Sequence, residues 1–225
     1  MSKTFTKKDV LMYLDKIYKK TQDQRLNDEK VRSQILSKIN EACQITNLSF
    51  SNILQRLDFK PNDLTIEALE SFLAELRSIF WLQDFGFTNI VPLQAKKNSQ
   101  QPDFTAKHQD KTCAVEVFCL TQAHEQQRDS ALNVYVNFDP QFEGSKFGRD
   151  FMSKAGQKKT QLDFSNADIR VLLCVINSSP AVALNAEADM NKHAKFLREK
   201  LGWGVGYYIG VLAGEDSAIY PKLDS

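Results

Sequence analysis

Two acidic residues lie in segments whose apolar neighbours predict strands, and acids in such places can bind a metal ion. Asp103 follows Pro102 and opens the short run 104–106, while Glu116 lies inside the apolar run 114–120. An ionised carboxylate in such a run is costly to bury unless a cation pairs with it. Mg²⁺ prefers oxygen ligands, typically one or two carboxylates together with phosphate oxygens of a substrate. Asp103 and Glu116 are therefore candidate ligands for Mg²⁺ or Mn²⁺.

Strand geometry constrains where these two carboxylates can point. If their segments are neighbouring strands joined by a turn at 108–111, both side chains can reach one face at one end of the sheet. Alternation along the second strand places Glu116 on the same face as Phe118. Val115 and Val117 then lie on the opposite face.

Two helical patterns supply further candidates. Glu75 lies beside the apolar stripe of a helix predicted from residue 65 to near 86, so its carboxylate can reach the edge of the sheet. In a helix predicted over 146–162, Lys158 falls within the apolar face, and Lys159 lies about 100° further round. A lysine that faces inward needs a carboxylate as its partner.

This order of residues resembles the PD-(D/E)xK, or restriction-endonuclease-like, nuclease superfamily. The likeness lies in Ala74-Glu75-Leu76-Arg77 on a helix, Gly86-Phe87 after it, Pro102-Asp103-Phe104 opening a strand, and Ala114-Val115-Glu116-Val117-Phe118 in the next strand. The resemblance implies that Asp103 and Glu116 hold the metal ion, and that Glu75 joins them directly or through water. It also implies a metal-dependent phosphodiesterase, a DNA endonuclease with Mg²⁺ or Mn²⁺ as its cofactor.

The sequence departs from the superfamily pattern two residues after Glu116, where Phe118 stands in place of the usual lysine. Some members of the superfamily carry this lysine on the later helix. The segment that resembles theirs is Lys158-Lys159-Thr160-Gln161-Leu162. The resemblance therefore assigns the activation of the attacking water to Lys158. Gln161 would act as a polar helper, and Gln122 is a weaker substitute for the lysine.

The elements that must position these residues follow an α/β pattern. Helical periodicity in the first 60 residues predicts two or three packed helices ahead of the helix that carries Glu75. Short apolar runs then predict strands at 90–91, 104–106, 114–120, 169–176 and 205–212, with helices at 146–162 and 186–201. This order predicts an α/β fold with a mixed central sheet flanked by helices, a restriction-endonuclease-like core with an N-terminal helical extension.

Charge predicts a boundary at Pro61. Residues 1–60 carry twelve basic and seven acidic side chains, a net of +5, whereas residues 61–92 carry one basic and five acidic, a net of −4. We therefore expect a helical N-terminal unit at 1–60 and a nuclease-like α/β domain at 61–225. A second basic stretch, at 144–160, carries five basic residues against one acidic, and such local excesses favour contacts with phosphate.

Composition excludes several classes of protein. Of the 225 residues, 42% are hydrophobic and 25% are charged, which is typical of globular rather than disordered chains. The net charge of +1 means that a nucleic-acid partner must be recognised by local charge. No apolar run could span a bilayer, and the polar N-terminus lacks the features of a signal peptide, so we expect no membrane partner and a cytoplasmic location. The four widely spaced cysteines are expected to be free thiols: Cys43, Cys113, Cys119 and Cys174.

Two hypotheses of different classes follow. The first is the DNA endonuclease, in which the N-terminal helices would recognise DNA or form a homodimer. The second keeps the fold without the chemistry: a catalytically inactive nuclease-fold module that binds nucleic acid or a protein partner, with Phe118 marking the lost activity. The two hypotheses differ on whether Asp103 binds metal.

Overall fold

The protein arranges its helices around one sheet, and a computed structural model describes residues 4–57, 59–94, 100–120, 146–176, 186–214 and 216–223. Its helices are α1 (Lys7–Thr21), the 3₁₀ helix η1 (Gln24–Asn27), α2 (Glu29–Thr46), α3 (Phe50–Arg56), α4 (Ile66–Asp84), α6 (Lys146–Phe164) and α7 (Ala186–Leu201). Its strands are β1 (Thr88–Pro92), β2 (Phe104–His108), β3 (Lys111–Leu120), β4 (Ile169–Ile176), β5 (Tyr207–Ala213) and β6 (Asp216–Tyr220).

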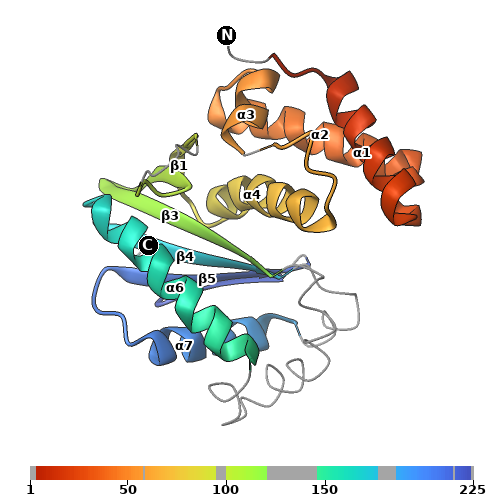
Figure 1. Ribbon diagram of the computed structural model, residues 1–225. Helices are drawn as coiled ribbons and strands as arrows, with labels where there is room; N and C mark the ends of the chain where they lie inside the picture. Colours follow the sequence, from red (N-terminus) through yellow and green to blue (C-terminus); the bar gives the residue numbers. More distant parts are fainter. Residues whose placement is uncertain are drawn as a thin grey trace.

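The six strands form one mixed sheet in sequence order, from β1 to β6. β1, β2 and β3 are antiparallel neighbours, β3, β4 and β5 run parallel, and β6 returns antiparallel to β5. The two parallel connections contain α6 and α7, which lie together on one face of the sheet (Figure 1). The predicted α/β class with a mixed sheet is confirmed.

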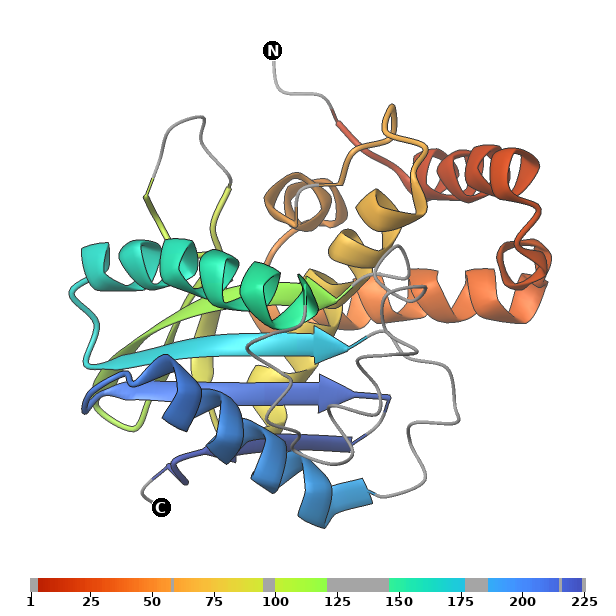
Figure 2. The same cartoon turned by 60° about the horizontal axis from the view of Figure 1, so that its bottom comes forward.

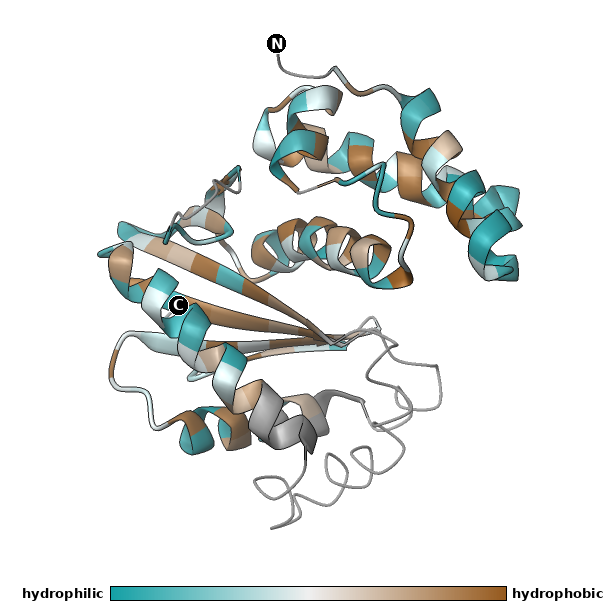
Figure 3. Ribbon diagram, in the orientation of Figure 1, coloured by the Kyte–Doolittle hydropathy of each residue, from teal (hydrophilic) through white to brown (hydrophobic). Residues whose placement is uncertain are grey.

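Helices cover both faces of the sheet, and Figure 2 shows α6 and α7 crossing the strands. The opposite face packs against α4 and the N-terminal helices, as Figure 1 shows. Strand alternation divides β3 between two apolar clusters: Val115 and Val117 belong to the cluster on the α4 side, and Phe118 to the cluster on the α6 side. The apolar residues of the strands are evident in Figure 3. The predicted assignment of faces along β3 is confirmed.

The N-terminal helices share their core with α4 and the sheet. Ile39 of α2 and Ile53 of α3 are fully buried in the same cluster as Leu76 of α4 and Val171 of β4. Phe59, in the segment after α3, lies with its ring centroid 5.3 Å from that of Phe72 on α4. The apolar core is therefore continuous across residue 61, where the charge along the sequence changes sign. The division into two domains stays a prediction.

Several boundaries differ from those that the sequence predicts. β4 and α7 occupy the predicted ranges, and β3 begins three residues earlier than expected. β5 begins at Tyr207 because Val205, which we expected within this strand, is almost fully exposed in the loop after α7. The strand β6 was not predicted, because its first residues, Asp216 and Ser217, are polar and interrupt the apolar run.

Two further expectations concern cysteines and membranes. The four cysteines are free thiols, as expected. Among the helices in the described part of the chain, none combines the length and the apolar character that crossing a bilayer requires.

Candidate active site at the edge of β3

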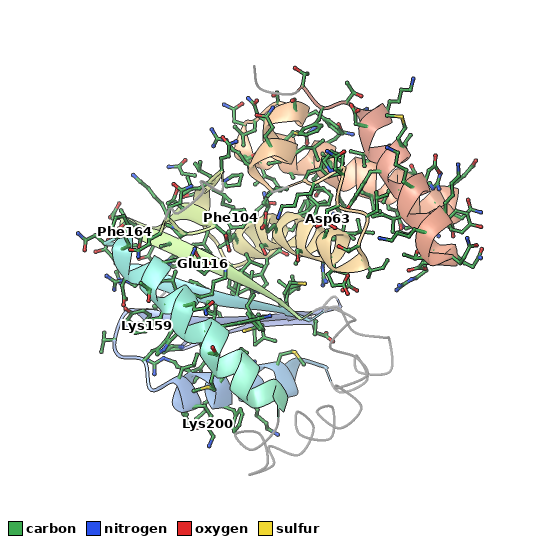
Figure 4. All side chains as sticks on the ribbon, viewed as in Figure 1. Asp63, Phe104, Glu116, Lys159, Phe164 and Lys200 are labelled. Atoms are coloured by element: carbon green, nitrogen blue, oxygen red, sulfur yellow. The ribbon has the colours of Figure 1, made fainter. Side chains whose placement is uncertain are left out.

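Glu116 lies in the middle of β3 and its side chain is completely buried (Figure 4). Among the residues that the structure describes, the ammonium group of Lys158 is the donor that approaches this carboxylate, at Oε2. Burial, and after it the nearby carboxylate of Asp103, raise the pKa of Glu116 to about 8 against the opposing effect of the Lys158 ammonium group. An ionised carboxylate inside an apolar strand is costly, so this group either keeps its proton or has its charge balanced by a cation.

Asp103 immediately precedes β2, and the strand register brings it to Glu116. Phe104 pairs with Val115, so extending the antiparallel register by one residue places Asp103 opposite Glu116. Its Oδ2 atom accepts a hydrogen bond of 2.8 Å from the backbone N–H of Val117. Asp103 thus provides a hydrogen-bond acceptor for the backbone of β3 just before β2 begins. The two acids lie next to each other, as the sequence predicts.

Lys158 projects from α6 between the two carboxylates. Its Nζ atom lies 2.5 Å from Glu116 Oε2 and 3.2 Å from Asp103 Oδ2. Burial alone would lower the pKa of this ammonium group, but the two carboxylates outweigh that effect and raise it above its ordinary value. Lys158 therefore stays charged at neutral pH, and the inward orientation that its helical position predicts is observed.

Phe118 occupies the position of the missing strand lysine, and its environment is apolar. The ring is buried and packs edge-on against Phe151 of α6 at a centroid distance of 5.3 Å. Because Phe118 and Glu116 share the face covered by α6, a lysine on that helix can reach the carboxylate. The structure thus supplies a cation from the helix where the superfamily pattern has one on the strand.

A pocket of about 370 Å³ opens at the edge of β3, beyond the end of β2. Asp103 and Lys158 line it, and the buried Glu116 lies next to both. The other charged residues around the pocket are Glu75 from α4, Lys154 from α6, and Arg56 and Lys60 from the N-terminal unit.

Glu75 lies on this pocket but not in the carboxylate pair. Its position confirms that the helix places it at the edge of the sheet. The described residues contain no group of three or more potential metal ligands, so Asp103 and Glu116 meet as a pair. Glu75 shares the lining of this pocket with Asp103 and Lys158, and its part in metal binding, direct or through water, stays a prediction.

Gln161 and Lys159 have contacts away from the carboxylates. The side-chain amide of Gln161 donates a hydrogen bond of 3.4 Å to the carbonyl of Gln101, two residues before Asp103. Gln161 thus connects α6 to the segment that carries Asp103 and acts as a positioning residue. Lys159 turns away from the site, as predicted, and its Nζ lies 2.7 Å from Asp163 and 3.1 Å from the hydroxyl of Tyr207. Gln122 lies outside the described residues.

The donor set fits a hard divalent cation. Glu116 is fully buried, Asp103 offers a second carboxylate next to it, and the ammonium group of Lys158 shows that a cation is accommodated between them. Two carboxylates and an open pocket on one side are what Mg²⁺ or Mn²⁺ requires when phosphate oxygens complete its coordination. Asp103 and Glu116 would hold the metal ion.

Sequence reasoning did not identify Arg56 and Lys60 as part of this site. They lie more than 40 residues before Asp103, and their spacing indicates only the end of a short helix. Their presence at the pocket depends on how α3 packs beside β1.

Comparisons of the chain with protein-family models, curated proteins and solved structures give no match.

Proposed function

We propose that the protein is a metal-dependent phosphodiesterase of the PD-(D/E)xK type, and specifically a DNA endonuclease. The observation that carries this proposal is the position of the Lys158 ammonium group, between Asp103 and Glu116 and at the wall of an open pocket. Two acids on neighbouring strands and an inward lysine are the groups that the resemblance requires. The lysine comes from α6, so the strand position two residues after Glu116 does not have to supply one and can hold Phe118.

Each group has a role in phosphodiester hydrolysis. Mg²⁺ or Mn²⁺ on Asp103 and Glu116 would supply Lewis-acid polarisation of a phosphate oxygen. Lys158 orients the attacking water and stabilises the negative charge that develops on the phosphorane. Glu75, across the pocket, can accept a hydrogen bond from a water molecule. The buried setting strengthens these electrostatic contacts, because little solvent screens them.

The decisive experiment is cleavage of plasmid, linear, branched and single-stranded DNA, and of RNA, in Mg²⁺ and in Mn²⁺. The wild type is compared with Asp103→Ala and Glu116→Ala, and with Asp110→Ala, which removes an exposed acid in the turn between β2 and β3. We expect metal-dependent cleavage of DNA by the wild type and by Asp110→Ala, and none by the two site variants. Undiminished cleavage by either site variant would contradict the assignment of the pair.

The second candidate function is the inactive nuclease-fold module, and Phe118 is the observation that favours it. It predicts that the wild type binds no Mn²⁺ at the carboxylate pair and that Asp103→Ala leaves the function intact. Calorimetric titration with Mn²⁺ separates the two candidates. Binding by the folded wild type that Asp103→Ala abolishes supports the phosphodiesterase, and silence in both titration and cleavage supports the module.

A location in the cytoplasm accords with both candidates. The four free thiols are typical of a reducing compartment.

A further inference from the structure

The outer part of the pocket carries three cations that the carboxylate pair does not use. Arg56 at the end of α3 is half-buried, and Lys60, four residues later, is exposed. Lys154 lies one helical turn before Lys158 on α6, and its Nζ is 5.7 Å from the centroid of the Phe118 ring. Arg56 and Lys60 come from the N-terminal unit and Lys154 from α6, and all three line the same pocket.

The balance of charge at this opening favours an anion. Lys158 contacts both carboxylates of the pair. Of the other charged residues that line the pocket, three are cations, Arg56, Lys60 and Lys154, and one is an acid, Glu75. Fixed cations beside an open, polar pocket attract phosphate, and arginine and lysine side chains provide most of the phosphate contacts made by nucleic-acid-binding proteins.

We propose that Arg56, Lys60 and Lys154 form a phosphate subsite that binds a nucleic-acid strand at the phosphate next to the one placed at the carboxylate pair. This inference rests on the proposed function and deepens it, because it assigns part of the substrate site to the N-terminal unit. The N-terminal helices then contact the same strand that is cut.

Arg56 also connects this subsite to the carboxylate pair. Its guanidinium group donates a hydrogen bond of 3.1 Å to the carbonyl of Pro92 at the end of β1. The next residue, Leu93, donates its backbone N–H to the carbonyl of Asp103 at 2.8 Å. Two hydrogen bonds and one peptide unit therefore connect Arg56 to the backbone of Asp103, a proposed metal ligand.

The test is the binding of a short fluorescent single-stranded oligodeoxynucleotide in the absence of divalent metal, over a series of salt concentrations. We compare the wild type with Lys60→Gln and Lys154→Gln, both exposed positions where folding should be unaffected. Lys16→Gln and Lys195→Gln are controls, since they remove exposed lysines on α1 and α7 outside the pocket. Each rim variant should weaken binding and reduce the slope of log K against log salt by about 0.7, the value for one phosphate contact on a single strand.

The controls should bind with the wild-type affinity and slope. Wild-type affinity in both rim variants, equal losses in the controls, or no binding by the wild type would each overturn the subsite. A mononucleotide serves as competitor, because it cannot occupy two phosphate positions. If it displaces the oligonucleotide at equal concentration, the pocket binds free nucleotides and the strand-binding proposal fails.

Arg56 also donates a hydrogen bond to the carbonyl of Pro92, so its replacement can alter the local structure as well as the charge. A conservative variant separates these two effects. Arg56→Lys keeps the charge and should bind more tightly than Arg56→Gln, with a steeper salt dependence. Binding is measured without metal, so failure of this inference is separate from failure of the proposed function. A chain that binds in this way but cuts no nucleic acid contradicts only the phosphodiesterase. Metal-dependent cleavage with unaltered binding by the rim variants contradicts only the subsite.

Discussion

At the scale of single residues, one ammonium group determines the character of the site. Lys158 lies between two carboxyl groups, one of them fully buried, and its positive charge favours the ionised form of both. The ammonium group is next to both carboxyl groups, and Lys158 also lines the pocket. In the proposed phosphodiesterase the same group would act on the substrate. Its neighbour Lys159 forms an ion pair with Asp163 and a hydrogen bond with the hydroxyl of Tyr207, away from the two carboxyl groups.

Replacing Lys158 should therefore affect catalysis far more than binding. Lys158→Met is expected to lower the rate of DNA cleavage by about 10²- to 10³-fold, the usual cost of losing one group that stabilises transition-state charge. Its affinity for DNA should change little. Lys159→Met, which removes the adjacent charge on the same helix, should cleave at nearly the wild-type rate. Single-turnover cleavage and binding assays on both variants test this, and equal cleavage by Lys158→Met and wild type would contradict the role of Lys158.

The titration of Glu116 should be visible in the stability of the fold. Its pKa is about 8 in the folded protein against an ordinary value of 4.5, so the folded chain retains a proton that the unfolded chain releases between these values. The contribution of this group is fully present below about pH 4.5 and is lost as the pH rises to about 8. Asp103 and Lys158 face the same group, and the charge of Lys158 does not change in this range.

Glu116→Gln removes this titration while preserving the size of the side chain. Between about pH 5 and about pH 8 the free energy of unfolding of the wild type should fall more steeply than that of the variant, because only the wild type loses the proton. Urea denaturation of both proteins at a series of pH values measures the difference. Parallel profiles would show that the carboxyl group titrates alike in the folded and unfolded states.

At the scale of elements, the close packing of α4 on the sheet fixes the wall that carries Glu75. Gly210 of β5 lies directly beneath Trp81 of α4. A Cβ atom at this position would lie 2.7 Å from Trp81 Cζ2 and 2.8 Å from Leu173 Cδ1. The absence of a side chain therefore allows the helix to lie against the strand.

Gly210→Ala should destabilise the protein by about 1–3 kcal/mol, the cost of overpacking a close-packed core. Gly156→Ala is the matched control. This glycine lies in α6 with no atom within 4 Å of an added Cβ, so alanine there should stabilise the protein by about 0.4–1 kcal/mol. Chemical denaturation of the two variants should give changes of opposite sign. A neutral Gly210→Ala would show that α4 can move away from β5 without cost.

At the scale of the whole molecule, the N-terminal helices and the α/β sheet are held by one apolar cluster. This cluster extends from Val10 of α1 to Ile219 of β6. Arg56 adds a polar contact between α3 and β1 at the edge of the pocket. The two halves that charge distinguishes are therefore expected to fold together.

Ile53→Ala tests this expectation because Ile53 is fully buried in α3. Removing its side chain should cost about 2–5 kcal/mol. Both tryptophans lie beyond residue 60, so their fluorescence reports on the α/β part and on its contacts with α2, whereas circular dichroism reports on all helices. A single transition, shifted equally in both signals, is expected. A fluorescence transition that Ile53→Ala leaves in place would indicate two independently stable domains divided at Pro61.

The sequence by itself determined the elements with strong periodicity and the residues that depend on them. The ranges of β4 and α7, the face of β3 that carries Glu116 and the inward direction of Lys158 all follow from repeats of two or 3.6 residues. Such repeats are local properties of the sequence. The apolar residues they define face the core whichever element packs against them, so the buried face of each strand or helix can be assigned without knowing its neighbour. The meeting of Asp103 with Glu116 also follows, because a short hairpin leaves few registers that keep both apolar faces buried.

Only the tertiary structure decided what surrounds the carboxylate pair. The sequence contains no signal that brings Arg56 and Lys60 to the pocket, since α3 reaches β1 through packing between residues far apart in the chain. The contact of Gln161 with Gln101 depends in the same way on where α6 crosses the sheet. β6 forms because the exposed edge of β5 offers unpaired backbone groups, and not because its own sequence has a strong strand pattern. Packing between distant segments, which a local repeat cannot encode, completes the site.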